Sequence, residues 1–196
     1  MQRRLGDVES GDPARAVAPY LIVPGWGGSD PTHWQTHWQR ELGARRIEVA
    51  DWDAPRLADW LRALDEAVRG VEVPPVLIAH SLGCIAVARW AAGASRPVRG
   101  ALLVAPSDLD REGCPAVLRE FAPVPRGRLP FPARVVASDN DPYAALPRAQ
   151  QMASDWGAAV TVLFGAGHIN VASGHGPWRD GLALLDRIDA VSDSVS

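Results

Sequence analysis

The chain has 196 residues, of which 47% are hydrophobic and 22% are charged, and its formal net charge is -3. This length fits one domain with a sizeable core, and the near-neutral charge argues against nucleic acid or an anionic membrane surface as a partner, since both favour clustered positive charge. All 20 basic residues are arginines, and the absence of lysine excludes a P-loop lysine, a Schiff base with a carbonyl substrate and a pyridoxal-phosphate lysine.

The ends of the chain and its two cysteines carry little chemistry. Cys84 and Cys114 form no disulfide framework and lack the spacing of metal ligands. Residues 1–18 are charged without an apolar stretch, and no run reaches the roughly 18 apolar residues of a membrane span. We therefore expect a cytoplasmic protein with a flexible tail at 1–18, a single domain at 19–190 and a C-terminal tail at 191–196.

Six short apolar runs, rich in β-branched residues, recur along the chain. Most are continuous rather than alternating, which is typical of strands buried on both faces of a parallel sheet. We predict strands at 20–23, 46–49, 76–79, 101–105, 134–137 and 161–164. Helical periodicity occupies the stretches between them, at 32–42, 57–68, 82–92, 144–156 and 178–188. Strands that alternate with helices imply right-handed crossovers, so we expect an α/β fold with a mostly parallel central sheet of about six strands and helices on both faces.

A glycine-rich loop follows the first predicted strand at 24–28. Its glycines lack the G-x-G-x-x-G spacing of a dinucleotide-binding loop, because Asp30 stands where the third glycine would be. His33 and His37, in the next helix, have a spacing that could bind a metal, but neither a third ligand nor an intervening glutamate accompanies them. We therefore predict neither a dinucleotide nor a metal at these residues.

The segment from the third predicted strand into the next helix has the pattern of a nucleophile elbow. Ser81 follows the strand directly, and the residues two before and two after it, Ala79 and Gly83, are small. Such a turn holds the serine in a strained backbone conformation and projects its hydroxyl above the carboxyl end of the sheet. Taken alone, the same serine also fits an ordinary helix N-cap.

One connection is unusually long. Residues 106–133 are rich in Pro and Arg, and we predict one short helix in them, near 115–121. Loops of this length commonly form lids or pocket walls.

Residues that could activate Ser81 follow it in the order acid, then histidine. Asp139 and Asp141 lie in the loop after the strand at 134–137, and His168 lies in the glycine-rich loop after the strand at 161–164. A histidine can take the serine proton, and an acid can hold the histidine in the required tautomer. The order Ser, acid, His characterises one large class of serine hydrolases.

Within these loops we favour Asp141 as the acid. It lies four residues beyond the predicted strand, where Pro142 would stiffen the turn, whereas Asp139 follows the strand so closely that a local role is expected. Asp108 is a further candidate. His175 is a rival to His168, but its position just before a helix favours a role in shaping the loop.

Backbone donors for a developing oxyanion are expected from two loops. The N–H of Leu82 opens the helix after Ser81, and the N–H of Trp26 lies in the glycine-rich loop after the first strand. Nearby residues predict an apolar substrate pocket of modest size. The pocket residues we expect are Gly25, Trp34, Phe121 and Phe131.

With these motifs assembled, the sequence resembles the small serine hydrolases of the retinoblastoma-binding protein 9 family, a compact branch of the α/β-hydrolase superfamily. The resemblance runs from Tyr20 to about Ile188. Its markers are Pro24-Gly25-Trp26, His33-Trp34-Gln35, His80-Ser81-Leu82-Gly83, Asn140-Asp141-Pro142-Tyr143, Gly167-His168-Ile169-Asn170 and Gly174-His175-Gly176-Pro177-Trp178. The resemblance implies a triad of Ser81, Asp141 and His168, no cofactor and no large cap domain. The partner that gives the family its name is recognised through an L-x-C-x-E segment, and the nearest segment here, 82–86, lacks the acid.

The sequence therefore predicts a serine hydrolase that acts on small carboxylic esters or amides through an acyl-enzyme. Two alternatives use the same frame. One is a catalytically silent binding or regulatory module, and the other is an acyltransferase that passes the acyl group to an alcohol or amine.

Overall fold

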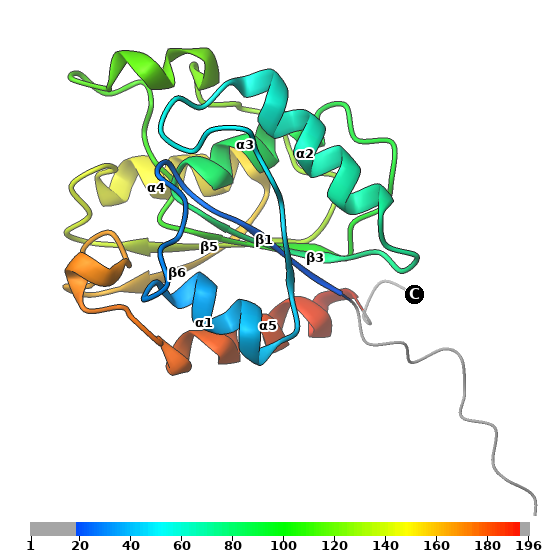
Figure 1. Cartoon of the computed structure of the whole chain (residues 1–196). Helices are drawn as coiled ribbons and strands as arrows, with labels where there is room; N and C mark the ends of the chain where they lie inside the picture. Colours follow the sequence, from blue (N-terminus) through cyan, green and yellow to red (C-terminus); the bar gives the residue numbers. More distant parts are fainter. Residues whose placement is uncertain (1–18, 193–196) are drawn as a thin grey trace, which may run out of the picture.

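The computed structural model describes residues 19–192, which form a six-stranded sheet flanked by helices (Figure 1). Every strand pair is parallel, and the strand order is β2-β1-β3-β4-β5-β6. The elements in chain order are β1 (Tyr20–Val23), α1 (Trp34–Glu41), β2 (Arg45–Arg46), α2 (Leu57–Arg69), β3 (Val76–His80), α3 (Leu82–Ala91), β4 (Gly100–Val104), the 3-10 helix η2 (Ala116–Phe121), β5 (Ala133–Ser138), α4 (Leu146–Trp156), β6 (Ala159–Leu163), the 3-10 helix η3 (Val171–Ser173) and α5 (Arg179–Ser192).

Helices cover both faces of the sheet. In Figure 1, α1 and α5 lie below the sheet, and α2, α3 and α4 lie above it. The central strands β3 and β4 are buried at every position, because they have neighbours on both edges and helices on both faces. These observations confirm the predicted α/β fold class with its parallel sheet and two helical layers.

Each helical layer packs on the sheet through tryptophans. Below the sheet, the Trp34 ring lies 4.7 Å from that of Trp38, which stacks on Trp178 at 5.4 Å. Above it, Trp60 of α2 meets Phe121 edge to face at 5.4 Å. The buried positions of α2 recur at helical spacing, which gives the helix one apolar face toward the sheet.

The structure differs most from the predicted elements at three places, and most of the other bounds differ by one or two residues. The second strand is Arg45–Arg46 rather than 46–49, because it lies at the edge of the sheet and pairs only with β1. The short helix predicted near 115–121 is the 3-10 helix η2. Helix α5 continues to Ser192, two residues into the predicted C-terminal tail. The predicted tail at 1–18 and the rest of the tail at 193–196 lie outside the described residues.

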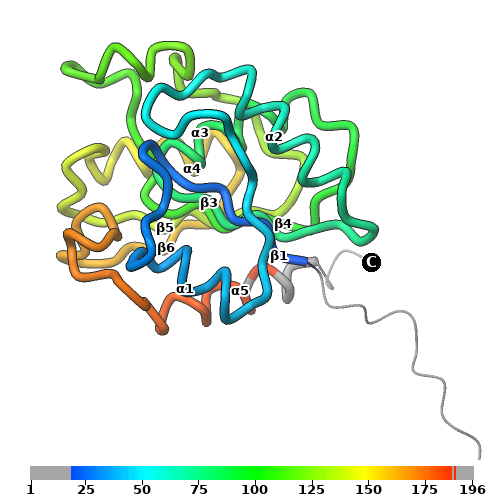
Figure 2. Tube along the Cα trace, viewed as in Figure 1, coloured from blue at the N-terminus to red at the C-terminus, as the bar shows by residue number. Residues whose placement is uncertain are grey.

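The parallel arrangement places the loops that follow the strands at one edge of the sheet. In Figure 2 the loops after β5 and β6 lie at the left, whereas β1 starts at the right. Side chains far apart in the sequence can therefore meet at that edge. Among residues 19–192, no helix is both long and apolar enough to cross a membrane.

Candidate active site

Ser81 occupies a strained turn between β3 and α3. Its backbone has φ 55° and ψ -121°, a conformation that is uncommon for a residue with a side chain. Its side chain makes no capping hydrogen bond with α3, so the alternative of an ordinary N-cap serine is wrong. The turn depends on Gly83, since a Cβ there would collide with the backbone carbonyls of Val23 and Pro24.

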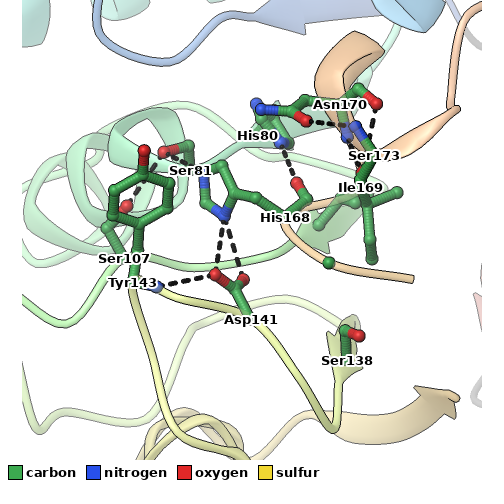
Figure 3. A network of polar contacts seen from close by, with 12 residues as sticks. His80, Ser81, Ser107, Ser138, Asp141, Tyr143, His168, Ile169, Asn170 and Ser173 are labelled. Carbon is green, nitrogen blue, oxygen red and sulfur yellow. Dashed lines mark hydrogen bonds and ion pairs between the residues drawn. The ribbon is translucent and has the colours of Figure 1, made fainter. Parts of the chain in front are cut away.

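A hydroxyl, an imidazole and a carboxylate lie in one hydrogen-bonded row at this edge of the sheet (Figure 3). His168 Nε2 is 2.9 Å from Ser81 Oγ, and His168 Nδ1 is 2.9 Å and 3.0 Å from the two carboxylate oxygens of Asp141. Because a carboxylate only accepts, Nδ1 carries the imidazole proton, and Nε2 accepts the hydroxyl proton of Ser81. The row suits proton transfer from the serine to the histidine.

The structure brings together the predicted Ser81, Asp141 and His168, whereas the rival residues are engaged elsewhere. Asp139 accepts the backbone N–H of Gly165 at 2.7 Å. Asp108 pairs with Arg148 at 3.1 Å, and the ring of His175 contacts its own loop. No hydrogen bond or ion pair joins any of these rivals to Ser81 or His168.

The loop that carries His168 is fastened to the loop after β5 by side chains that bind its backbone. The N–H of Ala166 donates to Ser138 Oγ at 3.1 Å, and the N–H of Gly167 donates to Asn140 Oδ1 at 2.7 Å. Both anchors come from the segment that carries Asp141. The acid and the histidine are therefore positioned by the same pair of loops.

Two further histidines, His80 and His33, continue the ring contacts of His168. The His80 ring centre is 4.9 Å from that of His168 and 4.9 Å from that of His33, and His80 Nε2 donates to the backbone carbonyl of His168 at 2.9 Å. Burial lowers the pKa of His33 to about 4, and burial, together with the charges that His168 and His33 could carry, holds the pKa of His80 well below its ordinary value. At neutral pH neither ring therefore places a positive charge beside His168.

His33 has a structural role that differs from metal binding. Its Nδ1 accepts the backbone N–H of Gln35 at 3.2 Å, so it caps the first turn of α1. Among residues 19–192, no group of three or more His, Cys, Asp or Glu side chains could hold a metal ion.

Sequence reasoning missed Ser107, whose Oγ lies 2.8 Å from Ser81 Oγ. Because the single hydroxyl proton of Ser81 is directed to His168, Ser107 is the donor in this contact. Ser107 follows β4, the neighbour of β3 in the sheet, and a turn at Ala105 with φ 49° precedes it. A serine just beyond the carboxyl end of the strand next to the nucleophile turn was the available signal.

Tyr143 is a second residue that the sequence reasoning did not place in the site. Its ring meets the imidazole of His168 edge to face, with 4.5 Å between ring centres. Its backbone N–H donates to Asp141 Oδ1 at 2.9 Å (Figure 3). Tyr143 therefore supports both the histidine and the acid.

The two residues predicted to supply backbone donors, Trp26 and Leu82, line a common cavity. Both residues line a cavity of about 510 Å³ together with Ser81 and His168. Gly25 lines it too, and a Cβ at that position would lie only 2.9 Å from Ser81 Cβ, so the loop after β1 approaches the serine closely. Within residues 19–192, neither N–H donates to a protein acceptor.

Three of the four predicted pocket residues do not line this cavity. Trp34 is fully buried below the sheet, and Phe121 and Phe131 belong to the core above it. Closeness in sequence to the site loops did not reveal that these large aromatic side chains point into the core. The apolar wall comes instead from Leu82, Leu109, Pro115, Leu118 and Val171.

Comparison with known proteins is consistent with this geometry. A family of serine hydrolases matches residues 20–187. A YdeN-like hydrolase from Pectobacterium atrosepticum is 31% identical over 89% of this chain and 92% of its own, with a TM-score of 0.79. The ydeN gene product of B. subtilis is 21% identical over 88% and 99%, with a TM-score of 0.72.

A more distant structure, Est1E from Butyrivibrio proteoclasticus with ferulic acid bound, is 14% identical over 94% of this chain and 91% of its own, with a TM-score of 0.65. No curated protein sequence matches the chain. The structural likenesses confirm the compact fold that the sequence predicted.

Proposed function

Because the chain belongs to the serine hydrolase family of the α/β-hydrolase superfamily, we propose that it cleaves small carboxylic esters or amides through an acyl-enzyme on Ser81. The observation that supports this most is the unbroken row from Ser81 Oγ through His168 to Asp141, with both contacts of the imidazole at 2.9–3.0 Å. The strained turn at Ser81 adds to it, because such turns present a nucleophile to substrate.

In the proposed reaction, Ser81 Oγ attacks the carbonyl carbon while its proton passes to His168 Nε2. The tetrahedral intermediate collapses when the carbon–oxygen or carbon–nitrogen bond to the leaving group breaks, and the imidazolium gives that group its proton. Water then attacks the acyl-enzyme with His168 as base, which releases the acid and restores the serine. Asp141 keeps the proton on Nδ1 and stabilises the imidazolium throughout.

The carbonyl oxygen becomes negatively charged in both tetrahedral intermediates. We assign its stabilisation to the N–H groups of Trp26 and Leu82, which line the cavity and have no acceptor in the described part of the chain. Leu82 is the first residue of α3, where the helix dipole also favours negative charge.

Within the superfamily, we place the chain in the retinoblastoma-binding protein 9 branch. Support comes from the motifs at 80–83, 140–143 and 167–170. Distant neighbours with the same fold include the ferulic acid-bound Est1E and a type II thioesterase, YbtT. We therefore include oxygen esters and thioesters among the substrates to be tested.

A test of this proposal is the hydrolysis of para-nitrophenyl butyrate by wild type, Ser81→Ala and Ser154→Ala. Ser154 is an exposed serine in α4 and serves as the matched control. We expect a burst of para-nitrophenol in wild type and Ser154→Ala, and none in Ser81→Ala. Activity that survives in Ser81→Ala, or no activity on a panel of esters, amides and thioesters, would contradict the proposal.

Added methanol distinguishes hydrolysis from acyl transfer, since the same acyl-enzyme serves both. A hydrolase forms mainly butyric acid at low methanol concentration, whereas a transferase forms mainly methyl butyrate. A folded protein that turns over no substrate but binds a ligand tightly would favour the silent binding module.

A further inference from the structure

One wall of the cavity carries a cation that no step of the proposed mechanism uses. Arg111, from the long connection after β4, lines the same cavity as Ser81 and His168. Its guanidinium carbon lies 5.7 Å from the ring centre of Tyr143, and that ring lies 4.5 Å from the imidazole of His168. Two consecutive ring contacts therefore separate the cation from the proposed base.

The described part of the chain gives Arg111 no ion-pair partner. Among residues 19–192, no carboxylate lies within ion-pair distance of its guanidinium, whose one hydrogen bond, at 3.3 Å, goes to the backbone carbonyl of Glu112. Two of the acids close in sequence are paired with another arginine: Arg148 binds Asp108 at 3.1 Å and Asp110 at 2.6 Å. The third, Glu112, is exposed, and it meets Arg111 through its backbone carbonyl.

Besides Asp108, the cavity wall carries one other acid among the described residues, Asp30, and its carboxylate also has a partner. Its Oδ1 accepts the backbone N–H and the hydroxyl of Thr32, and these bonds lower the pKa of Asp30. The two carboxylates of the cavity thus have partners within the protein, whereas most of the five guanidinium donors of Arg111 have no acceptor among residues 19–192.

The surroundings of Arg111 indicate the kind of anion that fits. Leu109, Leu118 and Val171 add apolar surface to the cavity that Arg111 lines, and a guanidinium beside apolar surface binds a planar carboxylate through two parallel hydrogen bonds. A phosphate dianion would be repelled more strongly than a carboxylate by Asp30 and Asp108, which face the same space.

We infer that Arg111 binds a carboxylate on the substrate, so that the enzyme prefers esters that carry a carboxylate beyond an apolar spacer. This inference rests on the proposed function, because it concerns the same cavity. It makes Arg111 a specificity residue, with no part in bond cleavage.

The experiment compares charged esters with neutral matches on both sides of the scissile bond. On the acyl side, para-nitrophenyl hydrogen adipate is paired with para-nitrophenyl hexanoate. On the leaving-group side, para-carboxyphenyl acetate is paired with its methyl ester. The variants are Arg111→Gln, Arg111→Lys and the control Arg119→Gln, which removes an equal charge from an exposed position of η2 outside the cavity.

We expect Arg111→Gln to lower kcat/KM about 10- to 100-fold for the charged ester of at least one pair, the range for a lost charge-assisted hydrogen bond, and to leave both neutral esters unchanged. Arg111→Lys keeps part of the preference, and Arg119→Gln behaves as wild type. Equal effects of Arg111→Gln on charged and neutral esters, or no effect on either charged ester, would overturn the inference. If wild type turned over none of the four esters faster than Ser81→Ala, the proposed function would be refuted instead. The failure of the inference and the failure of the proposed function are therefore distinguishable.

Discussion

The side chain of Asp141 decides which nitrogen of His168 carries the proton. Replacing it by asparagine puts an amide in the same place, and the NH₂ group of this amide can donate to His168 Nδ1. The imidazole proton then moves to Nε2, and a protonated Nε2 cannot accept the proton of Ser81. We expect Asp141→Asn to fold as wild type and to lose about 10³- to 10⁴-fold in kcat. Steady-state hydrolysis of para-nitrophenyl butyrate measures the loss.

Asp139→Asn is the matched control for this substitution. The asparagine keeps an oxygen that can accept the N–H of Gly165, so kcat is expected to stay close to wild type. The opposite pattern, with Asp139→Asn inactive and Asp141→Asn active, would show that the acid has been misassigned.

Ser107 donates a hydrogen bond to the oxygen that is proposed to attack the substrate. This bond, with 2.8 Å between the two Oγ atoms, holds the side chain of Ser81 in one orientation. Its loss is expected to misorient the nucleophile without removing it. We predict that Ser107→Ala lowers kcat/KM about 3- to 10-fold, the range for one neutral hydrogen bond. Ser107→Thr, which keeps a hydroxyl, should recover most of the activity, and an unchanged kcat/KM in Ser107→Ala would exclude the role.

At the scale of single elements, the cap of α1 gives the protein a pH-dependent stability. Burial lowers the pKa of His33 from its ordinary value of 6.5 to about 4 in the folded protein, and these two values bound a pH window. As the pH falls through this window, the unfolded chain takes up a proton that the folded protein does not, so the free energy of unfolding falls. His33 alone accounts for a loss of up to about 3 kcal/mol between the upper and lower ends of the window.

His33→Asn isolates this effect, because asparagine also caps helices but does not titrate. We expect wild type and His33→Asn to have similar urea midpoints at neutral pH. Below the ordinary pKa of histidine, the midpoint of the variant should fall less steeply than that of wild type. Parallel curves across the window would contradict the assignment of the low pKa to His33.

The elements of the sheet were largely predictable, because burial on both faces gives β3 and β4 continuous apolar sequences. Less was predictable at the edge. The run at 46–49 alternates charged and apolar residues as a strand can, but this strand has β1 as its one neighbour, and only Arg45 and Arg46 pair with it. The turn at Ser81 was predictable because such a turn leaves room only for small residues two positions before and after the serine. The structure shows why at Gly83, which lies against the backbone at the end of β1.

The lining of the cavity was much less predictable than its chemistry. Ser81, Asp141 and His168 each follow a predicted strand. Because parallel strands end at one edge of the sheet, the sequence alone predicts that these three residues meet there. Whether Phe121 faces the cavity or the core depends on how the long connection folds over α2, and no local pattern encodes that contact. Ser107 was missed although it closely follows a predicted strand, because its partner Ser81 lies 26 residues away in the sequence.

At the scale of the whole molecule, a hydrogen bond links the layer below the sheet to the loop that carries His168. Trp34 of α1 donates its Nε1–H to the backbone carbonyl of Ile169, the residue after His168, at 2.8 Å. Trp60, in the layer above, is equally buried, but its Nε1–H has no partner within the described residues. The two tryptophans therefore form a matched pair for the same substitution.

We predict that Trp34→Phe lowers the free energy of unfolding by about 1–3 kcal/mol more than Trp60→Phe, because it leaves a buried carbonyl unpaired. It should also lower kcat, since the bond holds the backbone next to His168. Urea unfolding and steady-state kinetics of both variants measure the two effects. Equal losses of stability and of kcat would show that this link contributes nothing specific.

The central claim, that Ser81 is a nucleophile activated by His168, is tested most directly by labelling with a fluorophosphonate and measuring the intact mass. We expect one phosphonyl group per chain in wild type and in Ser154→Ala, mapped by peptide analysis to Ser81. Ser81→Ala should remain unlabelled, and Asp141→Asn should label much more slowly than wild type. A folded wild-type protein that takes up no label, or a label that persists in Ser81→Ala, would contradict the account.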